Sequence, residues 1–291
     1  DLHSFPTRRS SDLAEESAED IAEGIGWNRA EIRGCMETIY HYTGLETLAL
    51  ILENKTIRFS NLCRLDDPLE KYVSIKKTTE DNHRLHNERE NMGAFCFVSC
   101  WTHNEDESIP MWDMYADRKQ GVRIEMPVDM FDPEFNINFR ERNTKPLFTI
   151  DRKNTMPEFF DIDYDRIGDP ALITEDWRVE IGNLGKYKIR DWAFQNECRF
   201  RVFGFRHKEE EKAFYYTAAD VRKTGTVNLE YPAKEKAVYF RLNDGAISMM
   251  RIIAGPKMSD GKRVLLKSLM EKYNISEDRV RDSRFTDRRE S

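Results

Sequence analysis

The chain has no apolar run close to the roughly 20 residues that a membrane-spanning helix needs, so we expect no transmembrane segment and no membrane partner. It also has no internal repeats, no glycine period and no low-complexity segments, which excludes the fibrous classes. Aromatic residues are not scarce: they make up 11% of the 291 residues, which argues against a disordered chain. We therefore expect a globular protein of one large or two small domains.

An apolar export-signal core is also missing near the start of the chain. The five cysteines are odd in number and scattered, which is typical of reduced thiols in the cytoplasm. We therefore predict a cytoplasmic protein.

The first residues look foreign to the rest of the chain. Residues 1–13, DLHSFPTRRSSDL, resemble a translated sequencing adaptor, and residues 14–35 are acidic and rich in small residues. We expect 1–35 to be a non-native, disordered leader and 36–291 to be a single domain. Residues 1–35 hold 8 of the 53 acidic and 4 of the 46 basic residues, so the net charge falls from −7 to −3 without them. Such a nearly neutral domain argues against sequence-independent coating of nucleic acid.

Apolar patterns predict strands and helices in mixed order. Predicted strands span 37–43, 56–60, 93–101, 121–126, 236–242 and 249–254, with one more inside 191–205. Predicted helices span 45–54, 69–91, 111–115 and 261–273. The helix at 69–91 is mostly charged, and Asp66, Asp67 and Pro68 favour its start, because acids and proline suit a first helical turn. Strands and helices do not alternate strictly, so we predict an α+β fold, a single domain with a mixed or split sheet flanked by helices.

Strong nucleotide-binding and metal-binding motifs are absent from the sequence. Cys96, Cys100 and His103 have strand spacing, but a structural zinc site usually needs four ligands, so buried thiols are the better interpretation. His83 and His86 lie three residues apart on the predicted charged helix, where a solvated face explains them. We expect no bound metal.

A further group of polar residues lies in apolar surroundings and suggests a polar cleft. His41 lies between two tyrosines in a predicted strand, and Ser99 lies in the apolar strand at 93–101. Tyr115 shares a helix face with Trp112, three residues away. The remaining members are Glu197 and Arg199, which begin another strand, and Gln195, which lies just before it. Each residue taken alone has a structural explanation.

Seven segments in order carry a family resemblance. They are 40–43 (YHYT), 61–70 (NLCRLDDPLE), 97–102 (FVSCWT), 110–116 (PMWDMYA), 121–122 (GV), 192–199 (WAFQNECR) and 252–256 (IIAGP). With these segments the chain resembles the bacterial domain of unknown function 2971 family from Tyr40 almost to the C-terminus. Membership in that family assigns no biochemistry.

A more distant resemblance suggests an activity. The chain opens with a predicted strand that ends in His-x-Thr and is followed by a helix and a short strand. This order is similar to the opening of NAD-dependent ADP-ribosyltransferases. Gln195-Asn196-Glu197 resembles the third motif of these enzymes. The resemblance implies catalytic roles for Glu197, Tyr115 and Gln195, and NAD-binding roles for His41, Thr43, Ser99 and Arg199. A fixed carboxylate such as Glu197 stabilises the positive charge that develops on the ribose when the nicotinamide bond breaks. We therefore predict transfer of ADP-ribose from NAD to a protein or nucleic acid, in phage defence or as a toxin.

Two alternatives stay open. The first is a non-catalytic nucleic-acid or protein interaction module, because residues 36–130 carry 17 acids and 11 bases whereas 131–291 carry 28 acids and 31 bases. The second is a metal-dependent hydrolase or nuclease that uses Asp67 and Glu70. That acidic cluster is explained more simply as a helix N-terminus.

Overall fold

The computed structural model describes residues 37–67, 69–78, 85–133, 148–151, 156–165, 184–206 and 233–286. The chain divides into two units, Asp1–Glu37 and Thr38–Ser291, and the described residues beyond Glu37 belong to the second unit. The prediction of a disordered, non-native leader at 1–35 lies outside the described residues. In the described part of the chain, no helix is both long enough and apolar enough to cross a membrane.

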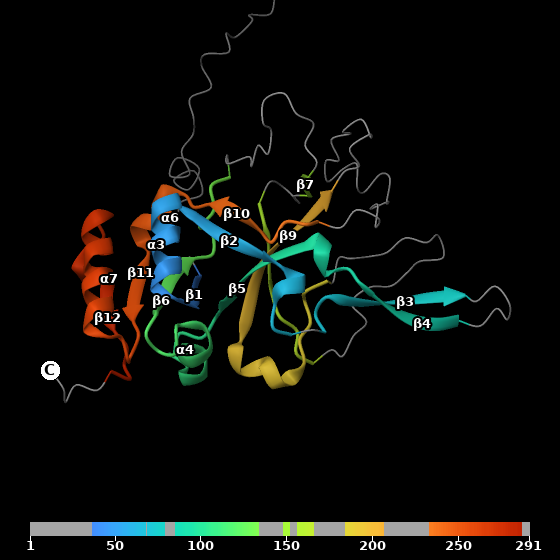
Figure 1. The fold of residues 1–291 in the computed structure, drawn as a ribbon, viewed down its shortest axis with the longest axis horizontal. Helices are drawn as coiled ribbons and strands as arrows, with labels where there is room; N and C mark the ends of the chain where they lie inside the picture. The colour runs from blue at the N-terminus through green and yellow to red at the C-terminus, as the bar shows by residue number, and fades with distance from the viewer. Residues whose placement is uncertain are drawn as a thin grey trace, which may run out of the picture. The chain divides into compact units, whose positions relative to one another are not determined.

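Ten of the described strands form one mixed sheet (Figure 1). Its main path runs in the order β10 (Ala237–Arg241), β2 (Thr56–Asn61), β5 (Cys96–Thr102), β1 (Thr38–Thr43), β6 (Val122–Pro127), β11 (Arg251–Ala254) and β12 (Val280–Asp282). β9 (Glu197–Arg206) joins the sheet at β5 and also pairs with β7 (Phe148–Asp151) and β8 (Glu158–Asp161). β11 and β12 are parallel, and the other pairs of this sheet are antiparallel.

The sheet splits at β5. Along one edge, β5 pairs with β9 over its whole length. Along the other edge, Phe97 and Val98 pair with β2, whereas Thr102 pairs with β1. Because a strand has only two edges, β1 and β2 share one edge of β5 and diverge from it. The prediction of an α+β fold with a mixed or split sheet and flanking helices is therefore confirmed.

Helices cover both faces of the sheet. The largest hydrophobic cluster joins one face to α3 (Leu45–Asn54), α6 (Asp244–Met249) and α7 (Asp260–Lys272), through residues such as Leu48, Ala246 and Leu266. We call this the α7 face. Helix α4 (Ile109–Tyr115) packs on the opposite face, the α4 face, where the buried Trp112 ring meets Tyr42 edge-on at 4.9 Å between centroids.

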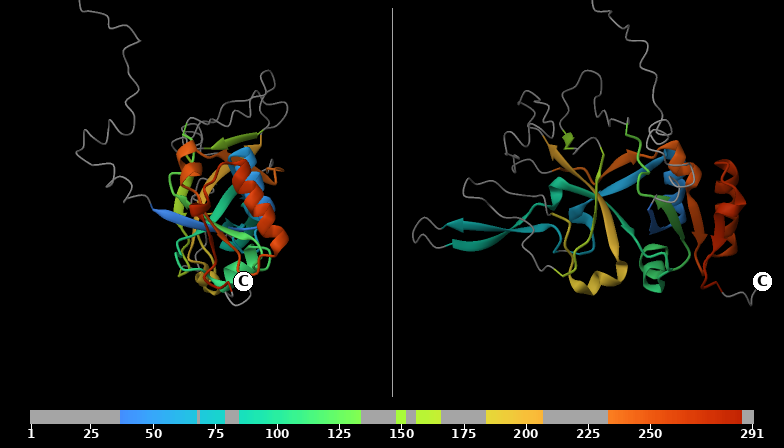
Figure 2. Two further views of the ribbon diagram at one scale, coloured as in Figure 1. Left: turned by 90° about the vertical axis from the view of Figure 1, so that its left-hand side faces the viewer. Right: turned by 180° about the vertical axis from the view of Figure 1, so that it is seen from behind.

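The predicted helix at 69–91 is wrong. The described residues there form a two-stranded hairpin of β3 (Tyr72–Thr78) and β4 (Leu85–Asn91), which lies at the other end of the sheet from α7 (Figures 1 and 2). The many charged residues of 69–91 led to the prediction of a solvated helix. The β-branched residues within 72–78 (YVSIKKT) favour a strand instead. The His83–His86 pair loses its helical spacing with this correction, and His83 itself lies outside the described residues. Residues 69–71 form a turn, so the acidic cluster before them starts no helix.

The other predicted elements are confirmed with small shifts of their ends. The strand predicted at 93–101 starts at Cys96, because Gly93–Phe95 forms a short 3-10 helix, η2. The sequence interpretation missed α6, β7, β8, β12 and the 3-10 helices η1 (Leu62–Arg64), η4 (Arg190–Gln195) and η5 (Glu277–Arg279). These elements are short, and β7 and β8 lie in a stretch without a readable pattern.

Candidate functional site

Strand register separates the predicted site residues onto opposite faces of the sheet. Ser99 lies opposite Phe200, whereas Cys100 lies opposite Arg199. Paired residues point to the same face, and successive residues along a strand point to opposite faces. Ser99 therefore lies on the α7 face together with Phe200, and Arg199 lies on the α4 face.

His41, Thr43 and Ser99 belong to the α7 face. Ser99 Oγ accepts a hydrogen bond from Trp101 Nε1 at 3.0 Å, and the His41 ring lies 5.1 Å from the Trp101 ring. His41 Nδ1 lies 2.8 Å from the backbone oxygen of Cys100, which can only accept, so Nδ1 carries the proton. Burial lowers the pKa of His41, so the ring is neutral at pH 7. The structure thus places His41 and Ser99 beside Trp101, and Thr43 lies opposite Val122 on the same face.

The α4 face carries a buried cluster of four charged residues, Glu70, Lys188, Glu197 and Arg199, which we call the ion cluster. Arg199 donates from Nε to Glu197 Oε1 at 2.5 Å and from Nη1 to Glu70 Oε2 at 2.5 Å. Lys188 Nζ donates to Glu197 Oε2 at 2.6 Å and lies 3.4 Å from Glu70 Oε1. Each of these side chains is at most 8% exposed. Two positive and two negative charges therefore compensate one another away from water.

Three members of the ion cluster, Lys188, Glu197 and Arg199, are charged at neutral pH. Burial by itself would raise the pKa of the Glu197 carboxyl, but Arg199 and Lys188 outweigh burial and lower this pKa to about 2. Burial would likewise lower the pKa of Lys188, but Glu197 and Glu70 raise it above its usual range. A carboxylate in this setting keeps its negative charge over the whole physiological pH range.

Gln195 and Tyr115 extend this network toward the surface. Lys188 Nζ donates to Gln195 Oε1 at 2.9 Å, and Gln195 Nε2 donates to the Tyr115 hydroxyl at 2.7 Å. Gln195 is 2% exposed and is held by Thr102, whose hydroxyl donates to its backbone oxygen at 2.5 Å. Tyr115 is half-buried, and burial raises its pKa, so its hydroxyl stays protonated. The structure therefore joins four predicted residues: Tyr115, Gln195, Glu197 and Arg199.

The surroundings of Lys188 Nζ form a cage for a positive charge. The ammonium has three oxygen neighbours, one each from Glu197, Gln195 and Glu70, and it lies 5.2 Å from the centre of the Trp192 ring. Carboxylates and an aromatic face are the groups that stabilise a cation in a water-poor site. Sequence reasoning missed Lys188, because no motif surrounds it, and it noted Glu70 only for the hydrolase alternative.

The residues considered for metal binding have other contacts. Glu70 binds Arg199, and Asp67 Oδ1 accepts from Leu69 N at 2.9 Å. Burial raises the pKa of the Cys96 thiol to about 12 and also raises that of Cys100, which disfavours the thiolate that a metal needs. Within the described ranges, no three His, Cys, Asp or Glu residues are grouped so that they could hold a metal ion.

No family model matches the chain, and no curated protein and no solved structure matches it. The resemblance to the domain of unknown function 2971 family and to ADP-ribosyltransferases stays a prediction.

Proposed function

We propose that this protein transfers ADP-ribose from NAD to a macromolecule, at the Tyr115 end of the ion cluster. The observation that supports this proposal is the cage around Lys188 Nζ, which combines the ionised Glu197, Gln195 and the Trp192 ring. NAD carries a positive charge on its nicotinamide ring, and the reacting ribose becomes positive as the ring leaves. Such a cage suits both charges.

In the proposed reaction, the bond between nicotinamide N1 and ribose C1′ breaks, and its electron pair leaves with nicotinamide. The acceptor nucleophile forms a new bond to C1′ and loses its proton to solvent. Glu197 stabilises the positive charge at C1′, because its carboxylate is already ionised and fixed by Arg199. Tyr115 and Trp192 pack against nicotinamide, beside the cage that holds the Lys188 ammonium.

The face assignment changes the roles that the resemblance implies. His41, Thr43 and Ser99 lie on the α7 face, so the proposal gives them no contact with NAD. Arg199 is fully buried and bonded to two carboxylates, so we assign it the positioning of Glu197 rather than contact with NAD. We place the activity in the cytoplasm, as a defence factor or a toxin.

Glu197→Gln is expected to lower NAD consumption by the full chain by about 100-fold or more, because it removes the charge that stabilises the reacting ribose. NAD loss and the transfer of label from radiolabelled NAD to proteins and RNA of a bacterial extract measure the two halves of the reaction. The matched control is Glu46→Gln, an exposed carboxyl on α3, which should leave both rates unchanged. Equal rates for Glu197→Gln and the unaltered chain would refute the proposal.

A second function, binding of a macromolecule without catalysis, is favoured by two observations. Both carboxylate oxygens of Glu197 already bind cations of the chain, so Glu197 has its charge compensated without a ligand. Exposed apolar side chains also lie beside Tyr115 and Gln195 in the sequence, with Met114 47% and Phe194 41% exposed. Salt-dependent binding of RNA, or saturable binding of a protein, that Glu197→Gln does not change would favour this function.

A further inference from the structure

Residues 283–286 follow β12 and contact the loop that joins β5 to α4; we call these residues the strap. Three donors of Arg284 bind this loop: N donates to Glu107 Oε1 at 3.0 Å, Nη2 to the Glu107 backbone oxygen at 3.0 Å, and Nη1 to Asp106 Oδ1 at 2.5 Å. Ser283 Oγ donates to Glu107 Oε2. The strap is therefore tied to the loop by four polar contacts, three of which end on Glu107.

Glu107 connects the strap to α4. Its side chain is buried, and its Oε2 also accepts a hydrogen bond from Trp112 Nε1 at 3.0 Å. The carboxylate thus has three donors, two of which belong to the strap. A buried acceptor that loses a donor costs free energy, because water cannot replace that donor. The strap therefore helps to fix the orientation of Glu107, and with it the bond that anchors the Trp112 ring.

Helix α4 buries few side chains. It has seven residues, and a helix of this length is not stable in water without tertiary contacts. Met111 and Trp112 are its two buried residues, whereas Ile109 and Met114 are exposed. Because Trp112 is one of only two buried side chains, the orientation of its ring governs the position of the helix. The bond between Trp112 and Glu107 therefore bears on the whole of α4.

The last residue of α4 is Tyr115, which belongs to the candidate site. Tyr115 lies three residues after Trp112, and its hydroxyl accepts from Gln195 Nε2 at 2.7 Å. Gln195 Oε1 in turn accepts from Lys188 Nζ at 2.9 Å. A continuous series of hydrogen-bonded and packed side chains therefore runs from the strap through Glu107 and α4 to the ion cluster. Such a series is a physical route by which one end can affect the other.

We propose that the strap is a conformational device that acts on the candidate site. While it is bound to Glu107, it holds α4 where Tyr115 meets Gln195, and its release withdraws Tyr115 from Gln195. The side chains of Arg284 and Asp106 are 51% and 87% exposed, and exposed ion pairs contribute little to stability, so the strap is weakly held. Segments with few buried contacts open at low free energy. The inference concerns the position of Tyr115 and does not depend on NAD chemistry.

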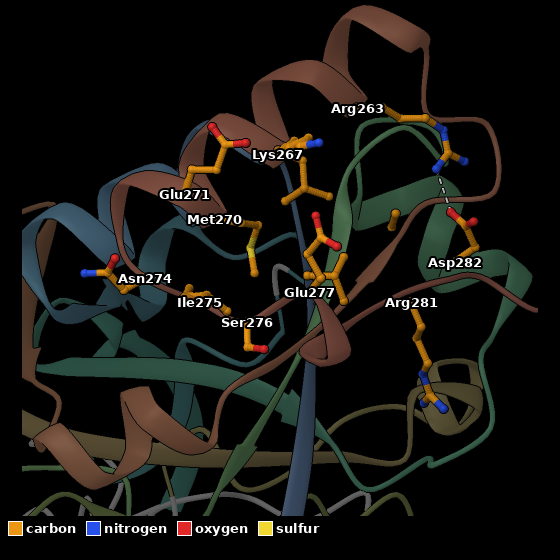
Figure 3. Close-up of a pocket in the computed structure, with 13 residues that line it drawn as sticks. Arg263, Lys267, Met270, Glu271, Asn274, Ile275, Ser276, Glu277, Arg281 and Asp282 are labelled. Carbon is orange, nitrogen blue, oxygen red and sulfur yellow. Dashed lines mark hydrogen bonds and ion pairs between the residues drawn. The ribbon is translucent and has the colours of Figure 1, made fainter.

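Hydrogen exchange of the full chain, followed by mass spectrometry, tests the release of α4. The double variant Ser283→Ala/Arg284→Met removes three of the four strap contacts and should speed the exchange of residues 109–116 by about tenfold or more. Exchange of α3 should not change, which shows that the fold is retained. The matched control is Arg263→Met. Figure 3 shows Arg263 bonded to Asp282, directly before the strap, and this variant should leave the exchange of α4 unchanged.

Labelling with 3-fluorotyrosine tests whether Tyr115 itself moves. Fluorine NMR follows the titration of its hydroxyl, and the resonance is assigned by its absence from Tyr115→Phe. Burial raises the pKa of Tyr115, so release should lower this pKa toward that of free fluorotyrosine in the double variant and not in Arg263→Met. The proposal is overturned if the double variant leaves the exchange of α4 or the titration of Tyr115 unchanged. It is also overturned if α3 and α4 exchange faster to the same extent, since the strap would then stabilise the whole fold. Neither measurement uses NAD, so a failure of the proposed transfer reaction would leave both results unaffected.

Discussion

Replacing Arg199 by methionine is expected to lower the free energy of unfolding by about 3–5 kcal/mol, the usual cost of removing one partner from a buried ion pair. Arg199 is fully buried and bonds to both Glu197 and Glu70. Without it, the single ammonium of Lys188 must compensate two buried carboxylates. Urea unfolding at pH 7, followed by tryptophan fluorescence, measures the change.

Arg263→Met is the matched control for this substitution. Arg263 also forms an ion pair, with Asp282 at 2.6 Å, but both side chains are more than a third exposed. An exposed pair contributes about 0–1 kcal/mol, so this variant should unfold at nearly the same urea concentration as the unaltered chain. If Arg199→Met lowered the free energy of unfolding no more than Arg263→Met does, the ion pairs of Arg199 would not stabilise the fold as buried pairs do.

Acid is expected to remove a stabilising contribution of Glu197 that is present at neutral pH. The pKa of Glu197 is about 2 in the folded chain, compared with an ordinary value of 4.5. A carboxyl with a lowered pKa stabilises the fold above its unfolded pKa, and this stability disappears as the pH falls from about 4.5 through about 2. The shift corresponds to about 3 kcal/mol.

Glu197→Gln isolates this contribution, because the amide does not titrate. The gap in unfolding free energy between the unaltered chain and Glu197→Gln should therefore narrow by about 3 kcal/mol between pH 7 and pH 2. Glu46→Gln, which alters an exposed carboxyl, should show no comparable change of the gap. A gap for Glu197→Gln that stays constant with pH would show that Glu197 keeps its ordinary pKa.

Much of the fold was predictable, because the core strands carry their own pattern. The continuous apolar residues of β5 and the alternation in β2 indicate strands without any tertiary information. The hairpin of β3 and β4 was not predicted, since its charged residues resemble a solvated helix face. β12 has only three residues, and its pairing with β11 comes from the crossover through α7, which no local pattern shows.

The candidate site was predictable in part. The residues that were wrongly grouped with it differ from the others in strand register, which decides the face of the sheet to which a side chain points. Glu197 and Arg199 are two residues apart at the start of a predicted strand, and this spacing puts them on the same face. His41 and Ser99 were grouped with them, but a shift of one residue decides the face of a strand residue. It is Tyr40 that lies opposite Thr102 and shares the face of Glu197. Lys188 and Glu70 come from distant segments, and only the folded chain brings them to Arg199.

The most direct test of the account is the melting temperature of the full chain with and without millimolar NAD, for the unaltered chain and for His41→Ala and Glu197→Gln. At 100-fold over the dissociation constant, NAD adds about 2.7 kcal/mol, which raises the melting temperature by roughly 5–8 °C. The account predicts this shift in the unaltered chain and in His41→Ala, and its loss in Glu197→Gln. No shift in the unaltered chain, or a shift that His41→Ala removes and Glu197→Gln retains, would contradict an NAD site on the α4 face.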